Sequence, residues 1–73
     1  MTPIEVTVAR IIRTKRAESG LSCKELAERI DCYGAQQIYN WENAKYAPGA
    51  HSLCLLADVF GCTVDELLGR DGK

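Results

Sequence analysis

The sequence predicts an all-α fold, with five short helices packed into one compact domain. Apolar residues recur at intervals of three and four along most of the chain, which is the spacing of one helix face. Capping residues precede several of these runs, and glycines follow them. With 73 residues, the chain is long enough for one small helical core. We expect a single domain over residues 1–69 and a frayed tail over 70–73.

The first helix is expected to begin within residues 2–5 and to end at Gly20. Thr2 and Glu5 have the spacing of a capping box, and Pro3 suits the first helical position because the N–H it lacks would have no partner there. Gly20 favours the left-handed conformation that ends many helices. Four apolar residues fall on one side of this helix: Ile4, Val8, Ile11 and Ile12.

Residues 22–43 have the pattern of two short amphipathic helices separated by a tight turn. Ser22 and Glu25 form a second capping box at the start of this segment. The helix that follows has one apolar stripe, formed by Leu26, Ala27 and Ile30. The turn covers residues 31–34, where an aspartate and a glycine favour turn geometry.

The second helix of this pair, expected over about 35–43, has two unlike faces. Ile38 and Trp41 point one way. At about 100° per residue, the opposite side carries Gln36, Asn40 and Asn43, with Tyr39 beside them. A carboxamide presents a donor and an acceptor side by side, which matches adenine N6 and N7 in the DNA major groove. A solvated helix face is the alternative interpretation of the same pattern.

Two more helices are expected after Pro48. Gly49 can cap a helix that stops at Gly61 and carries an apolar stripe of Leu53, Leu56, Ala57 and Phe60. Thr63 and Glu66 then repeat the capping box for a fifth helix, which runs through Leu68.

Together these segments resemble the phage repressor and Cro-like helix-turn-helix family, also called the XRE family. Its members typically have a leucine-serine pair and an acid before "LA", then a tryptophan or leucine before "EN", then a proline, an apolar helix and "DELL". This chain has the same order in Leu21-Ser22, Glu25-Leu26-Ala27, Trp41-Glu42-Asn43, Pro48, residues 53–60 and Asp65-Glu66-Leu67-Leu68. The resemblance covers about residues 11–69. It implies a lambda-repressor-like fold and a transcriptional regulator, expected to be a repressor, that binds double-stranded DNA.

The resemblance also implies roles for individual residues. The base-contacting residues would be Ala35, Gln36, Gln37, Tyr39 and Asn40. The phosphate contacts would be Arg13, Lys24, Tyr33, Asn43 and Lys45. A solvated surface role is the alternative for Arg13, Asn43 and Lys45, and a packing lid is the alternative for Tyr33. Arg16 and Glu42 occupy the positions of a partly buried ion pair that joins the first helix to the recognition helix. The hydroxyl of Tyr46 is a further candidate for a phosphate contact, or its ring a packing lid.

The chain departs from the family pattern in three places. The turn holds one residue more than is usual, which predicts a changed angle for the recognition helix in the groove. Cys23 and Lys24 stand where the family often has a phosphate-binding glutamine, and Lys24 can substitute as a cation. Ala44 replaces the glycine that usually adopts the left-handed conformation, with Asn43 as the alternative residue for that cap.

Charge argues against strong nucleic-acid binding, because the net charge is −1 and the sequence pI is about 5.7. Residues 1–48 carry seven lysines and arginines against six acids, whereas residues 49–73 carry two against four. The positive side is therefore the one that bears the motif, although the asymmetry is small. A protein-interaction module, antitoxin-like or anti-repressor-like, is the competing hypothesis, and the acidic pI suits it.

Other function classes find little support in the sequence. The four cysteines include no C-x-x-C pair and only one histidine accompanies them, so neither a metal site nor a disulfide framework is expected. No glycine-rich phosphate loop is present, so we expect no enzyme activity and no cofactor. No segment is apolar enough for a signal peptide or a membrane span, which predicts a cytoplasmic protein. The expected assembly is a homodimer, formed in solution or only on DNA, with Leu68 and the region after Cys62 as its surface.

Overall fold

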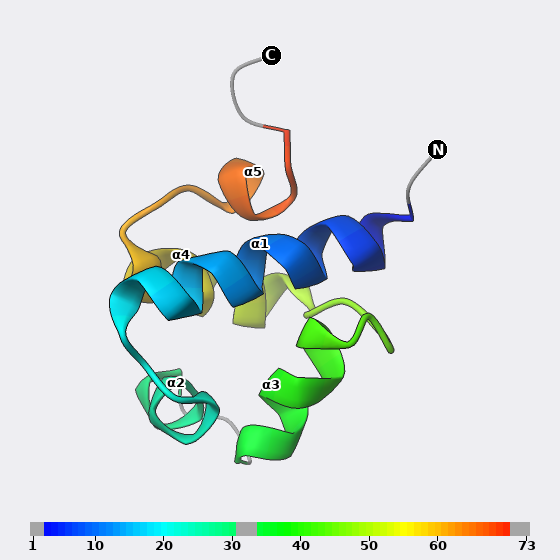
Figure 1. Ribbon diagram of the computed structural model, residues 1–73. Helices are drawn as coiled ribbons and strands as arrows, with labels where there is room; N and C mark the ends of the chain where they lie inside the picture. The colour runs from blue at the N-terminus through cyan, green and yellow to red at the C-terminus, as the bar shows by residue number, and fades with distance from the viewer. Residues whose placement is uncertain (1–2, 31–33, 71–73) are drawn as a thin grey trace.

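The computed structural model describes residues 3–30 and 34–70, and within these ranges it consists of five α-helices joined by short loops (Figure 1). The helices are α1 (Ile4–Ser19), α2 (Cys23–Arg29), α3 (Ala35–Glu42), α4 (Ala50–Phe60) and α5 (Val64–Leu67). No strand occurs in the described ranges. The prediction of a five-helix, all-α fold is confirmed.

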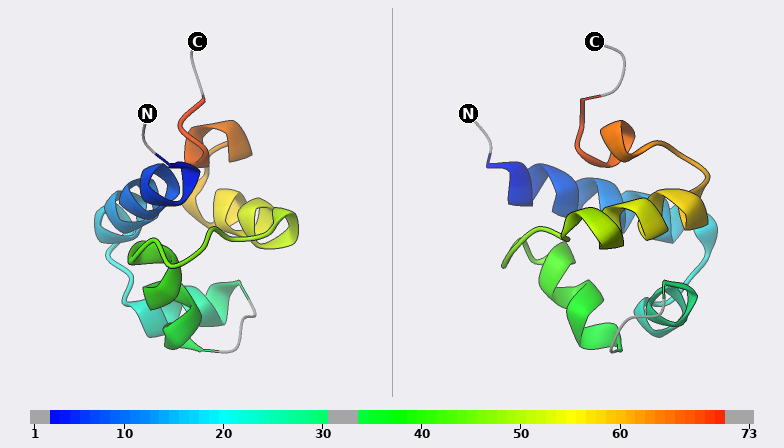
Figure 2. Two further views of the ribbon diagram at one scale, coloured as in Figure 1. Left: turned by 90° about the vertical axis from the view of Figure 1, so that its right-hand side faces the viewer. Right: turned by 180° about the vertical axis from the view of Figure 1, so that it is seen from behind.

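The longest helix, α1, lies in the middle of the fold and contacts α3, α4 and α5. Figures 1 and 2 show that α2 and α3 lie on one side of α1 and that α5 lies on the other side. The α4 helix runs alongside α1 between these two groups. This arrangement leaves much of α3 at the surface.

Every helix contributes to one apolar core. The largest side chains that are less than 2% exposed are Val8 and Ile12 of α1, Leu26 of α2, Ile38 and Trp41 of α3, Leu56 of α4, and Leu67 of α5. The apolar stripes expected on α2 and α3 are therefore buried. On the apolar side of α1, Val8 and Ile12 are buried, whereas Ile4 is 47% exposed because it lies in the first turn, one turn before the first buried residue.

The starts of the helices follow their capping residues. In α2, the Glu25 N–H donates to Ser22 Oγ at 3.0 Å and the Ser22 N–H donates to Glu25 Oε1 at 2.8 Å. Thr63 and Glu66 form the same reciprocal pair at the start of α5. For α1 the expected position was wrong by one residue, since Pro3 has an extended ψ of 147° and caps a helix that begins at Ile4. Thr2 lies outside the described residues.

Four of the five helices end at a residue with positive φ. Three of these residues are glycines, and the fourth is Ala44, with a φ of 59° after α3. The Ala44 N–H bonds to the Trp41 carbonyl at 3.1 Å, and the Lys45 N–H reaches back to the Asn40 carbonyl at 3.0 Å. This is the Schellman arrangement, which requires the left-handed conformation at residue 44. Asn43 has a φ of −97°, so the suggestion that it takes this cap was wrong.

Candidate nucleic-acid interface

The helices α2 and α3 form a packed pair, as the motif predicts. Leu26 and Ala27 of α2 and Ile38 of α3 belong to the same buried cluster. Ala27 is only 1% exposed, and its small side chain allows the two helices to approach closely. Residues 31–33, where a longer turn than usual is predicted, lie outside the described ranges. The candidate Tyr33 is among them.

The surface of α3 carries four of its five candidate base-contacting side chains. Gln36 is exposed, Gln37 and Asn40 are partly exposed, and Tyr39 is 50% exposed. The fifth candidate, Ala35, is partly buried and packs against the core. These placements come from the buried Ile38 and Trp41, which fix the rotation of the helix about its axis.

Three carboxamides on α3 form one hydrogen-bonded network with a tyrosine from the following loop. Gln36 Nε2 donates to Asn40 Oδ1 at 3.1 Å, and Asn40 Nδ2 donates to the hydroxyl of Tyr46 at 2.9 Å. That hydroxyl donates to Gln37 Oε1 at 2.6 Å. The hydroxyl proton of Tyr46 is thus engaged on α3, and the phosphate contact suggested for this residue stays a prediction. We call these four side chains the carboxamide network.

An ion pair joins α1 to the end of α3. Arg16 Nε donates to Glu42 Oε2 at 2.5 Å and Arg16 Nη2 donates to Glu42 Oε1 at 3.1 Å. A third donor, Nη1, binds the carbonyl of Leu21 at 2.9 Å. The hydrogen bonds to the Glu42 carboxylate raise the pKa of Arg16, and burial opposes them only partly. Glu42 is the one charged residue in the described ranges that is buried, with 8% exposure.

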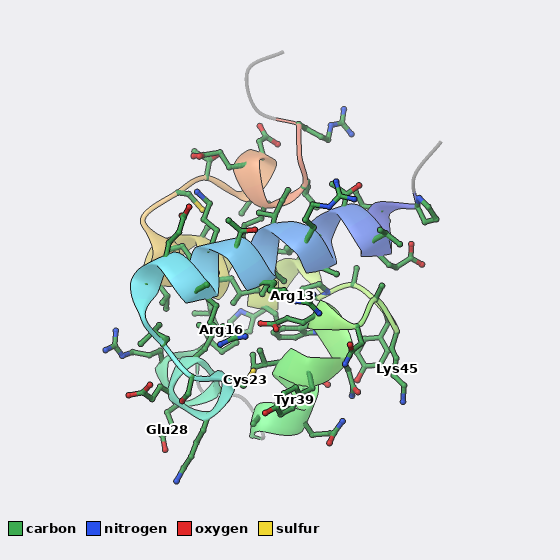
Figure 3. All side chains as sticks on the ribbon, in the orientation of Figure 1. Arg13, Arg16, Cys23, Glu28, Tyr39 and Lys45 are labelled. Carbon is green, nitrogen blue, oxygen red and sulfur yellow. The ribbon has the colours of Figure 1, made fainter. Side chains whose placement is uncertain are left out.

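The candidate phosphate contacts surround this pair. Arg13 and Asn43 line one groove between α1 and the end of α3, together with Arg10. The Arg13 side chain is 63% exposed, and its Nη2 donates to the Glu42 carbonyl at 3.4 Å. Lys45 is exposed on the loop after α3, where Figure 3 shows it pointing away from the body of the protein. Lys24 is exposed in the first turn of α2.

Cys23 links the start of α2 to α3, at the position where related motifs often carry a glutamine. Its thiol is buried, with 6% exposure, and lies close to Tyr39 in Figure 3. Burial, and then the nearby Glu42 carboxylate, raise the pKa of Cys23. Tyr39 remains half exposed beside it.

Two kinds of feature, a membrane-spanning helix and a group of metal ligands, are absent from the described residues. None of the helices there is both long and apolar enough to cross a membrane. Within the same ranges, no group of three or more histidine, cysteine, aspartate or glutamate side chains is placed to hold a metal ion.

Comparison with known proteins identifies the family. The family model HTH_3, described as helix-turn-helix, matches residues 12–67, which is more than half of the chain. The chain therefore belongs to the XRE-type helix-turn-helix family, a DNA-binding regulatory family. Comparisons with curated proteins and with solved structures gave no match.

Proposed function

From this family membership, we propose that the protein is a sequence-specific transcriptional regulator that inserts α3 into the DNA major groove. The observation that carries the proposal is the set of three carboxamides, Gln36, Gln37 and Asn40, which lie together on α3. An α-helix fits into the major groove, and carboxamides can pair with the base edges there. The buried Ile38 and Trp41 anchor the opposite face, so the reading surface is held by the core.

We expect the protein to make few contacts with the phosphate backbone of DNA. Arg16 is held in short contact with Glu42, whereas Arg13 lies 3.9 Å from the same carboxylate and is 63% exposed. The candidate cations are therefore Arg13, Lys24 and Lys45, with Asn43 as a neutral partner. Because affinity for any DNA depends on the number of phosphates neutralised, we expect weak non-specific binding and a shallow salt dependence. Specificity would then depend on the base contacts of α3 more than on charge.

The proposed binding unit is a homodimer on an inverted repeat. Two copies of α3 would enter successive major grooves about 34 Å apart, on one face of the duplex. Binding of such a dimer across a promoter would exclude polymerase, so repression is the expected outcome. The dimer surface suggested from the sequence, Leu68 and the region after Cys62, stays a prediction, and Leu68 is partly buried against the core. The exposed large aliphatic side chains of the described residues are Ile4 and Val6, on α1.

The test is selection from a random duplex library at moderate salt, with the full chain as bait. An enriched inverted repeat supports the proposal, and the spacing of its half-sites gives the geometry of the dimer. Gln36→Ala should then lower discrimination at one base pair by about 1–3 kcal/mol and leave the other positions nearly unchanged. No enrichment by a bait with a native thermal transition would contradict the proposal and favour the protein-interaction alternative.

A further inference from the structure

We infer that Tyr46 is a positioning residue for base recognition, which holds the carboxamides of Gln37 and Asn40 in one orientation. This inference rests on the proposed function, since it assigns a role within the same surface. Tyr46 lies outside α3, in the loop that follows it, and its hydroxyl touches both carboxamides. It would therefore influence which bases are read without contacting a base itself.

The chemistry of a phenol makes this contact directional. A hydroxyl has one proton to donate, and that proton is directed to Gln37 Oε1 at 2.6 Å. Its lone pair accepts from Asn40 Nδ2 at 2.9 Å. If the Gln37 carboxamide alone turned over, its NH₂ group would meet the hydroxyl and the phenol proton would lose its acceptor. If Asn40 alone turned over, its carbonyl oxygen would face the lone pairs of the hydroxyl. Tyr46 therefore ties the orientation of each carboxamide to that of the other.

The hydrogen bonds of the carboxamide network all run in the same donor-to-acceptor order. Gln36 donates to Asn40, Asn40 donates to Tyr46, and Tyr46 donates to Gln37. Bonds arranged in series polarise one another, so each one reinforces the orientation of the next. Outside this series, Gln37 keeps both amide hydrogens and Gln36 keeps its carbonyl oxygen. One end of the network therefore offers donors and the other an acceptor.

The backbone places Tyr46 where it can act in this way. The left-handed conformation of Ala44 turns the chain sharply after α3, and the Lys45 N–H closes the turn on Asn40. The loop then runs back along the helix, so that residue 46 reaches a side chain nine positions earlier. Tyr46 is 43% exposed, which leaves its hydroxyl on the same surface as the carboxamides.

A fixed carboxamide discriminates between bases better than a rotating one. A rotating amide can offer either its donor or its acceptor to a base, and so it tolerates a mismatch by turning over. An amide held by Tyr46 must give up a hydrogen bond to do so, which costs a factor of about 3- to 10-fold in equilibrium terms. Holding the side chains before binding also reduces the entropy lost on binding.

The test is Tyr46→Phe, which removes one oxygen and keeps the ring. In the free full-length protein, NMR of the side-chain NH₂ groups should show a shifted Asn40 resonance and faster hydrogen exchange there. Tyr39→Phe, the matched control, removes the same atom from another exposed tyrosine and should leave the Asn40 and Gln37 resonances in place. An unchanged Asn40 resonance in Tyr46→Phe would overturn the inference at this first step.

The second step repeats the library selection with wild type and Tyr46→Phe. We expect the variant to enrich the same half-site with preference reduced by about 3- to 10-fold at one or two base pairs. Its salt slope should not change, because no charge has been removed. In an Asn40→Ala background, Tyr46→Phe should have a smaller effect on those base pairs, since one of its two partners is already absent.

The outcomes separate this inference from the proposed function. A wild-type motif that Tyr46→Phe retains with full preference overturns the positioning role and leaves the proposed function intact. A wild-type bait that enriches nothing overturns both. Equal weakening on every sequence, with a lowered melting temperature, identifies Tyr46 as a structural residue and also overturns the inference.

Discussion

Arg16 and Glu42, which are 26 positions apart in the chain, are joined by two hydrogen bonds between guanidinium and carboxylate. These bonds connect the last turn of α1 to the last residue of α3. Because α1 is central to the fold, this contact ties the orientation of the candidate reading helix to the core. The Glu42 side chain is only 5% exposed, and Arg16 is its close partner, whereas Arg13 Nε lies farther off, 3.9 Å from Glu42 Oε1.

Removal of Arg16 should therefore be costly. We expect Arg16→Ala to lower the free energy of unfolding by about 1–3 kcal/mol, because it removes both short hydrogen bonds to a buried carboxylate and leaves only the more distant, exposed Arg13 beside it. Urea denaturation measures this loss. Arg10→Ala, which removes an exposed arginine from the same helix, should change stability by less than about 0.5 kcal/mol. Equal losses in the two variants would show that the pair contributes little.

Replacement of Ala44 by glycine should stabilise the protein. Residue 44 has a φ of 59°, a conformation that costs an L-residue roughly 1–2 kcal/mol. Ala44→Gly removes this strain, and we expect a gain of about 1 kcal/mol, partly offset by the greater freedom of glycine in the unfolded chain. The matched control is Ala17→Gly within α1, where glycine should instead destabilise by about 0.5–1 kcal/mol. Thermal and urea unfolding of both variants would reveal the opposite signs.

The buried thiol of Cys23 predicts a loss of stability at alkaline pH. Burial raises the pKa of this thiol above its ordinary value of 9.0, so the folded state holds the proton more tightly than the unfolded state does. The contribution is complete below pH 9 and is lost as pH rises through the folded pKa. The free energy of unfolding, measured from pH 8 to pH 10.5, should decline less in Cys23→Ala than in the wild type. The decline should persist in Cys54→Ala, which removes an exposed thiol.

Lys45 should affect all DNA sequences alike. If it neutralises one phosphate, Lys45→Ala will reduce the slope of log K against log salt by about 0.9 and weaken specific and non-specific binding together. Fluorescence anisotropy across a salt series measures both quantities. Lys15→Ala serves as the control, because Lys15 lies near Glu66 of α5, on the side of α1 away from α3. An equal slope change in the control would assign the effect to overall charge.

The five helices could be predicted because each boundary depends on local chemistry. Ser22 with Glu25, Thr63 with Glu66, and the glycines at 20 and 61 determine starts and ends through bonds within a few residues. The apolar stripes of α2 and α3 follow from helical spacing alone. The exposure of Ile4 could not be predicted, because spacing shows which side of a helix is apolar but not how far along the helix the core extends.

The carboxamide network could not be predicted from the sequence. Gln36 and Asn40 could be placed on one face from their spacing of four, but Tyr46 joins them through the geometry of a loop. That geometry depends on Ala44, a residue whose type argues against the conformation it adopts. No local pattern indicates that a tyrosine after the helix will turn back onto it. Contacts of this kind require the three-dimensional path of the chain.

The close approach of Gly69 to α1 has a practical consequence for experiments. A Cβ at Gly69 would lie 2.8 Å from Thr7 Cγ2, so the segment after α5 is held against the side of α1 opposite α2 and α3 (Figure 1). A fluorophore or an immobilisation tag attached beyond residue 70 would start out of reach of the carboxamides. Surface-based binding assays and single-molecule labelling should therefore use the carboxyl-terminal side of the chain.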